Sequence, residues 1–259
     1  MTTTWRCFGQ RAGLVAPARF LQIMELLAPS ALWRPCEDLP DKVWTVVPRR
    51  ARVMVETSGE VLGEWQDELE AARVTRSSIE LWAADRSKEH VAVHAAVVAR
   101  DDQAIVLPGP SGIGKSTLAL ALIDSGATYY SDEFAVFNRR GEVLPYPRPL
   151  ALRQAKGEGR VEVRHLSPSE LGAVVGQRPL SVKVIASLPF DPGLDAVDVQ
   201  QMSPAMGALH LIENSVAARS QPEAILDVVA RVARKARTLQ GKRGPSEEAA
   251  QFLLRYLAR

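Results

Sequence analysis

The sequence predicts an α/β protein: a mixed sheet flanked by helices, with a small N-terminal α+β region. The first observation behind this prediction is that an apolar strand pattern at 104–107, the glycine-rich run Gly109–Thr117 and an apolar helix pattern at 118–123 follow one another directly. The second is that the segment 91–99 and the strand at 104–107 are joined by a short connection that contains Asp101-Asp102, which predicts a hairpin. The strand before the glycine-rich run therefore has an antiparallel neighbour, and the sheet is expected to be mixed.

The chain is expected to divide into a small N-terminal region, 1–89, and a larger domain, 90–259. With 259 residues it is long enough for one large domain or for a catalytic domain with a smaller companion. In the first region, 51–57 and 61–65 alternate apolar and polar residues around a Ser-Gly turn, which predicts a hairpin in an antiparallel layer.

The elements after the glycine-rich run follow from local patterns. A helix over 116–125 is ended by Gly126, and the strand 127–131 follows it and reaches two acidic residues. The next segments, 134–137 and 142–144, predict another hairpin. We expect the glycine-containing segment Lys156–Arg164 to be a mobile loop.

The last third of the chain alternates strand and helix patterns. Ser203 and Pro204 are typical of a capping residue and the first position of a helix. The remaining expected elements are a strand at 180–188, a helix at 222–236, a short strand at 237–240 and a last helix from 245 or 246 to about 257.

Composition and charge limit the cellular locations and the classes of partner that we expect. The net charge of +2 gives no indication of long-range attraction to nucleic acid or to a membrane surface. The chain has no apolar run of about 18 residues, and its N-terminus lacks the pattern of a signal peptide. The two cysteines, Cys7 and Cys36, suit reduced thiols better than a disulfide framework. We therefore expect a cytoplasmic protein that has neither a nucleic acid nor a membrane as its partner.

The run Gly109–Thr117 has the spacing of a phosphate-binding loop. Its glycines allow successive backbone N–H groups to converge on a phosphate, and the following helix adds the partial positive charge of its N-terminus. In such a loop Lys115 reaches the β- and γ-phosphates, and the Ser116 hydroxyl binds Mg²⁺. The residues expected to bind the nucleotide are Gly109, Pro110, Ser111, Gly112, Ile113, Gly114, Lys115, Ser116 and Thr117.

Asp132 and Glu133 stand where the strand after the loop's helix ends, an edge at which α/β sheets bind ligands. One carboxylate can accept the proton of an attacking hydroxyl, and the other can hold Mg²⁺. We favour Asp132 as the base and Glu133 as metal ligand or support, with the reverse assignment open. A solvated acidic turn is the alternative for the pair.

His94 and two arginines are further candidates. The histidine shares a strand face with Ala92 and Ala96 and can contact a phosphate or influence the acidic pair, although strand histidines are more often structural. Arg148 or Arg153 can steer the phosphate or the acceptor, with a solvated arginine as the alternative for both.

Taken together, these residues resemble the HPr kinase/phosphorylase family and its shorter HPr-kinase-like relatives. The resemblance spans about residues 91–137, and Tyr130–Phe134 with Pro147–Pro149 is similar to the shorter relatives. It implies a kinase core similar to phosphoenolpyruvate carboxykinase, with ATP and Mg²⁺ as cofactors. It also implies that His94 and Lys115 assist transfer and that the acidic pair supplies the proton acceptor.

The chain also departs from that family. The metal-binding glutamate of the family's glycine-rich signature has only Glu158 as a counterpart, and the N-terminal region is shorter than in bifunctional members. A serine hydroxyl of a protein or precursor peptide is therefore the expected acceptor. A small-molecule kinase and a nucleotide-dependent regulatory protein are the alternatives, and the C-terminal helices are a candidate surface for a homo-oligomer.

Overall fold

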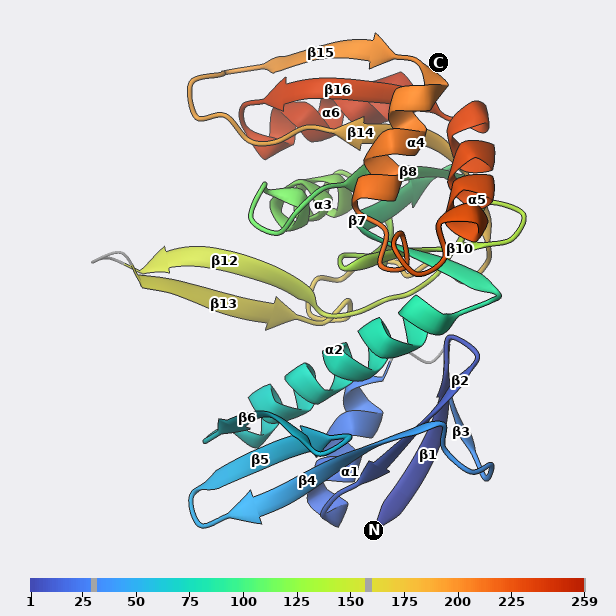
Figure 1. Cartoon of the computed structure of the whole chain (residues 1–259). Coiled ribbons are helices and arrows are strands. Elements are labelled where there is room, and N and C mark those ends of the chain that lie inside the picture. The colour runs from blue at the N-terminus through green and yellow to red at the C-terminus, as the bar shows by residue number, and fades with distance from the viewer. Residues whose placement is uncertain (29–31, 157–159, 259) are drawn as a thin grey trace. The chain divides into compact units, whose positions relative to one another are not determined.

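The computed structural model describes residues 1–28, 32–156 and 160–258 (Figure 1). It divides into two compact units, Met1–His90 and Val91–Arg259, and each is described by itself. The described residues form three sheets and six helices, so the predicted mixed α/β class is confirmed.

The first unit is a six-stranded sheet with two helices. Its strand order is β3-β1-β2-β4-β5-β6; β2 and β4 are parallel, and the other neighbours are antiparallel. The elements are β1 (Thr2–Cys7), β2 (Gln10–Val15), α1 (Ala18–Leu27), β3 (Trp33–Cys36), β4 (Lys42–Arg49), β5 (Arg52–Thr57), β6 (Glu60–Trp65) and α2 (Glu68–Arg86). The predicted hairpin is β5–β6.

Helix α2 did not stand out in the sequence because its buried residues include several alanines rather than a stripe of large apolar residues. Its start is nevertheless well defined, since the Asp67 side chain accepts a hydrogen bond from the Leu69 N–H. The core of this unit is aromatic and includes Trp44, which is fully buried and donates from Nε1 to Ser78 Oγ at 3.0 Å. Cys7 and Cys36 are both free thiols, as expected, and burial raises the pKa of the Cys7 thiol.

The second unit is built on an eight-stranded sheet with the order β11-β10-β7-β8-β14-β16-β15, and β9 pairs with β7. Strands β8, β14 and β16 are parallel, whereas β7 and β15 are antiparallel to their neighbours β8 and β16. The elements are β7 (His90–Arg100), β8 (Gln103–Pro108), α3 (Lys115–Asp124), β9 (Thr128–Ser131), β10 (Phe134–Asn138), β11 (Glu142–Leu144), β12 (Leu150–Lys156), β13 (Arg160–Leu166), β14 (Leu180–Ser187), β15 (Val197–Met202), α4 (Pro204–Glu213), α5 (Pro222–Lys235), β16 (Arg237–Arg243) and α6 (Ser246–Leu257).

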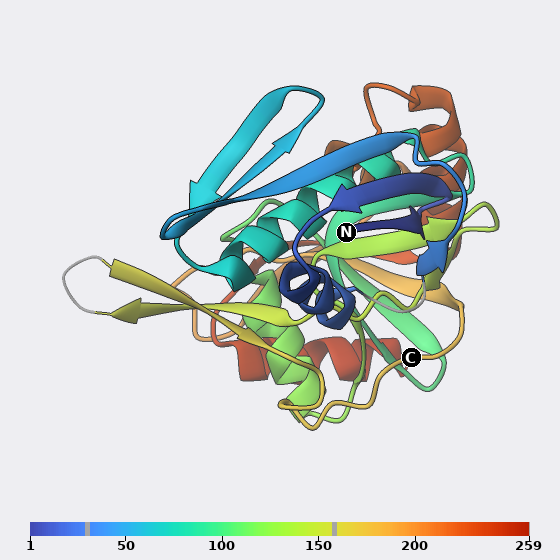
Figure 2. The same ribbon diagram turned by 90° about the horizontal axis from the view of Figure 1, so that it is seen from below.

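Helices cover both faces of this sheet. Strand residues alternate between two apolar clusters, so that Val97 belongs to one and Val98 to the other. The first cluster packs under α4 and α5, and the second packs under α3 and α6, which lie against each other in both ribbon views (Figure 2). The central strands β7, β8 and β14 are therefore buried on both faces. Their packing fixes the positions of the strand ends, where the candidate functional residues lie.

Two local predictions were wrong. The segment Lys156–Arg164 was expected to be a mobile loop, but Arg160–Leu166 is strand β13, paired antiparallel with β12 in a two-stranded sheet. The alternation of valines with charged residues from Arg160 to Arg164 is a strand pattern that the neighbouring glycines obscured. Helix α4 begins at Pro204 as predicted, but the Ser203 side chain makes no capping hydrogen bond.

A glycine is required in the middle of β16. A Cβ on Gly241 would overlap the carbonyl oxygen of Asp198 on the paired strand β15. We expect Gly241→Ala to lower the free energy of unfolding by about 1–3 kcal/mol, because the two backbones must separate. The check is urea denaturation followed by circular dichroism.

Gly193→Ala is the matched control, because its nearest neighbour would be the flexible end of Asp191 at 3.3 Å. This variant should unfold at nearly the wild-type urea concentration. Equal stability of the two variants would contradict the close approach of β15 and β16.

Candidate functional site

The glycine-rich run forms the turn between the end of β8 and the start of α3. Gly112 and Gly114 both have φ of 93°, a left-handed conformation that other residues adopt at a cost. Gly114 is the residue before the helix, and its carbonyl oxygen accepts the 3.1 Å hydrogen bond from the Leu118 N–H. The N–H groups that precede Leu118 in the first turn of α3 have no carbonyl partner within the helix. Such N–H groups are the condition for anion binding at a helix N-terminus.

Lys115 folds back over the loop that precedes it. Its Nζ donates to the carbonyl oxygens of Gly109 at 2.7 Å and Pro110 at 2.9 Å. An ammonium group has three N–H donors, so one remains for a phosphate oxygen. Burial lowers the pKa of Lys115, while the charges of Asp132 and Glu133 oppose that shift.

Asp132 is buried directly beside the loop. It follows the last residue of β9, and its Oδ2 accepts hydrogen bonds from Ser116 Oγ at 2.8 Å and from the Ala151 N–H at 3.1 Å. Its Oδ1 is also buried and has no hydrogen-bond partner among the described residues. Burial raises the pKa of the Asp132 carboxyl to about 7, although the two hydrogen bonds lower it.

Glu133 and His94 form the neighbouring pair. His94 Nδ1 donates to the Glu133 carbonyl oxygen at 2.9 Å and lies 3.5 Å from the Glu133 side chain. The same carbonyl accepts the Ala95 N–H, so strand β7 holds the backbone of the acidic pair. The centroid of the His94 ring also lies 5.8 Å from that of the Phe134 ring. Because Nδ1 carries the hydrogen, Nε2 of the neutral ring is an acceptor.

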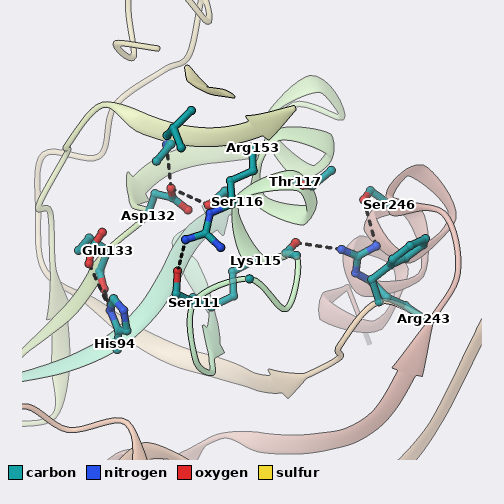
Figure 3. A pocket seen from close by; sticks show the side chains of 15 residues that line it. His94, Ser111, Lys115, Ser116, Thr117, Asp132, Glu133, Arg153, Arg243 and Ser246 are labelled. Carbon is teal, nitrogen blue, oxygen red and sulfur yellow. Dashed lines mark hydrogen bonds and ion pairs between the residues drawn. The ribbon is translucent and has the colours of Figure 1, made fainter. Parts of the chain in front are cut away.

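One pocket of ≈ 490 Å³ brings most of the predicted residues together (Figure 3). His94, Lys115, Ser116, Asp132 and Glu133 all line it. So do Ser111, Gly112, Gly114 and Thr117 of the loop, whereas Gly109, Pro110 and Ile113 do not. The remaining lining residues are Ala151, Arg153, Val163, Phe190, Arg243 and Ser246.

The oxygen atoms of Ser116, Asp132 and Glu133 are the ones that could hold a metal ion. Hydroxyl and carboxylate oxygens suit Mg²⁺, which is usually bound by one or two carboxylates together with substrate phosphates and water. The predicted ligand Glu158 lies outside the described residues. Within those residues the structure has no cluster of three or more His, Cys, Asp or Glu side chains suited to a metal. The described donor set therefore fits Mg²⁺ shared with a phosphate, not a cage made by the protein alone.

The two candidate arginines have different surroundings. Arg153 on β12 is exposed, lines the pocket and donates from Nη2 to Ser111 Oγ at 3.1 Å. Arg148 is only 6% exposed and lies over the Phe134 ring at 5.9 Å, so a solvated position is wrong for it. Of the two, Arg153 is the one whose guanidinium is available at the mouth of the loop.

The sequence reasoning missed Arg243, at the end of β16. Its side chain is buried, and it donates to Gly114 O at 2.9 Å, Gly244 O at 3.0 Å and Ser246 Oγ at 3.0 Å. Burial lowers the pKa of this guanidinium. The contact ties the loop to a strand 129 residues away in sequence, and no local pattern signals such a partner.

The comparisons with known proteins give little beyond this geometry. The chain matches no protein-family model and no curated protein. Among solved structures, it is similar to the Hpr(Ser) kinase/phosphatase from Coxiella burnetii over 65% of this chain and 93% of that one, at 17% identity and a TM-score of 0.32. This is a distant structural relation, so the function of the site has to be argued from its own residues.

None of the described helices combines the length and the apolar character that crossing a membrane requires.

The raised pKa of Asp132 predicts a pH-dependent stability. The folded state holds the proton up to about pH 7 and the unfolded chain only to about 3.8, so the contribution of Asp132 to stability falls as pH rises between these values. Asp132→Asn keeps an acceptor oxygen but does not titrate. We therefore compare the free energy of unfolding of Asp132→Asn with that of the wild type at each pH. The value for the variant minus the value for the wild type should rise by up to about 4 kcal/mol from pH 4 to pH 8.

Urea denaturation at several pH values measures this difference. Glu133→Gln removes the neighbouring carboxylate, whose side chain is 39% exposed, and serves as the comparison. A difference between Asp132→Asn and wild type that does not change with pH would contradict the burial of a titrating carboxyl at this position.

Proposed function

We propose that this protein is an ATP-dependent, Mg²⁺-requiring kinase that transfers the γ-phosphate to a serine hydroxyl of a protein or precursor peptide. The observation that carries the proposal is the position of Asp132. A buried carboxyl with a pKa near 7 lies within hydrogen-bond distance of the serine that follows the loop lysine. The candidate phosphate-binding loop and a candidate proton acceptor are thereby adjacent.

The general base has to take the proton of the attacking hydroxyl. A group with a pKa near the operating pH performs this step most effectively, and burial supplies that value for Asp132. Its buried Oδ1, which has no partner among the described residues, is the oxygen that would accept the hydroxyl proton, while Oδ2 keeps the bond to Ser116. The reverse assignment, with Glu133 as base and Asp132 at the metal, is the competing arrangement, and the contact with Ser116 makes it a serious one.

The loop side of the pocket has to hold the phosphates. The N–H groups at the start of α3, the remaining donor of Lys115 and the guanidinium of Arg153 all carry positive charge into the pocket. Ser116 with Glu133 would hold Mg²⁺, which neutralises charge on the phosphates when it is bound. Phosphoryl transfer needs positioning and charge stabilisation above all, and these residues provide both.

The acceptor class rests on the resemblance of residues 91–137 to HPr kinases and their shorter relatives. A serine side chain in a polypeptide is the acceptor that this resemblance implies. His94 is expected to assist the transfer through its contact with Glu133.

The test is transfer of labelled phosphate from ATP with Mg²⁺ to a panel of serine peptides and to proteins of a cell lysate. Wild type should label serine-containing acceptors and not the same peptides with alanine. Lys115→Ala should weaken nucleotide binding. Asp132→Asn should bind MgATP with an affinity close to wild type and lose transfer by about 100-fold or more, the usual effect of removing a general base.

Asp227→Asn is the matched control, because it removes an exposed carboxylate that pairs with Arg231 on α5. It should transfer phosphate at the wild-type rate. Unimpaired transfer in Asp132→Asn, with loss in Glu133→Gln, would assign the base to Glu133 instead. ATP hydrolysis without transfer to any acceptor would contradict the kinase.

A further inference from the structure

Phe190 stands apart from the other phenylalanines of the chain. It is 52% exposed, whereas Phe8, Phe20, Phe134 and Phe137 are buried and Phe252 is partly buried. An isolated exposed apolar side chain needs no explanation in itself. Phe190, however, lines the same pocket as the glycine-rich loop.

The position of Phe190 is fixed by its neighbours. Its N–H donates to the Ile113 carbonyl oxygen at 3.2 Å, which attaches it to the loop. The Arg243 guanidinium lies over its ring at 5.4 Å, and backbone bonds of Pro189 and Asp191 with Arg243 hold the segment against β16. The backbone at Phe190 is therefore held in place, and its half-exposed ring has the Arg243 guanidinium over one face.

The arrangement of residues along the pocket indicates which part of a bound nucleotide would lie near the Phe190 ring. In Figure 3, His94 and Glu133 lie at one end, Arg243 and Ser246 lie at the other, and Lys115 and Ser116 lie between them. A γ-phosphate that faces Asp132 would direct the rest of a nucleotide away from the acidic pair. The nucleoside would then extend toward Thr117 and the end at Arg243.

We propose that Phe190, supported by Arg243, is the stacking surface for the nucleobase of the bound nucleotide. This inference rests on the proposed nucleotide-binding function and adds the subsite that distinguishes a nucleotide from a bare polyphosphate. Every base has a flat π face, and stacking on an aromatic side chain is a common way to bind it. The Ser246 hydroxyl, which accepts a bond from Arg243, can still donate to a polar atom of the nucleoside.

The experiment compares two ligands by isothermal titration calorimetry with the full chain and Mg²⁺. ATP carries a base, and inorganic tripolyphosphate does not. We expect wild type to bind ATP more tightly. Phe190→Ala should weaken ATP binding by about 10-fold or more, the usual effect of losing one aromatic stacking partner. The same variant should change tripolyphosphate binding by less than about twofold, and Phe190→Tyr should retain most of the ATP affinity.

Leu226→Ala is the control, since Leu226 is 54% exposed on α5 and does not line the pocket. It should bind both ligands as wild type does. If Phe190→Ala lowers the affinity for ATP and for tripolyphosphate equally, the ring only supports the loop. If the ATP affinity is unchanged and the KM for the acceptor is raised, the ring contacts the acceptor and not the base. Either result overturns the base subsite. If wild type binds neither ligand, the proposed nucleotide function itself fails.

Discussion

The hydrogen bond from Ser116 to Asp132 joins the first turn of α3 to the end of β9, and the rest of the site depends on it. Burial of a carboxyl group is costly unless it is hydrogen-bonded or protonated. The strands β7 and β9 hold Asp132 in that position, and the Ala151 N–H supplies its second bond. The fold thus places a carboxyl of raised pKa where a phosphate-bearing ligand would bring its reacting end.

The loop itself is held by two cationic side chains. Lys115 closes it on one side through the Gly109 and Pro110 carbonyl oxygens, and Arg243 fixes it on the other through the Gly114 carbonyl oxygen. Arg243 is buried, and one of its three hydrogen bonds anchors the end of the loop at the start of α3. Such preorganisation lowers the cost of binding a charged group and of orienting it for reaction.

Much of this arrangement could be predicted from local patterns. The strand, loop and helix around Gly109–Thr117 and the hairpin before them are encoded by residues close together in the sequence, and so is the position of the acidic pair after β9. The contacts of Arg243 and Phe190 could not be predicted, because they depend on parallel pairing of β8, β14 and β16 across long connections. Strand β13 was missed for another reason, since two glycines outweighed a short valine alternation. The roles of His94, Lys115, Asp132 and Glu133 stay predictions, although the structure brings these residues into one pocket.

The proposed function requires that a nucleoside triphosphate binds against the turn between β8 and α3. The most direct measurement is a crystal structure of the full chain with a non-hydrolysable ATP analogue and Mg²⁺. We expect phosphate density at the N–H groups of Gly112–Thr117, with Lys115 in contact and the terminal phosphate directed toward Asp132. Density for the analogue at another part of the chain, with this turn unchanged, would contradict it.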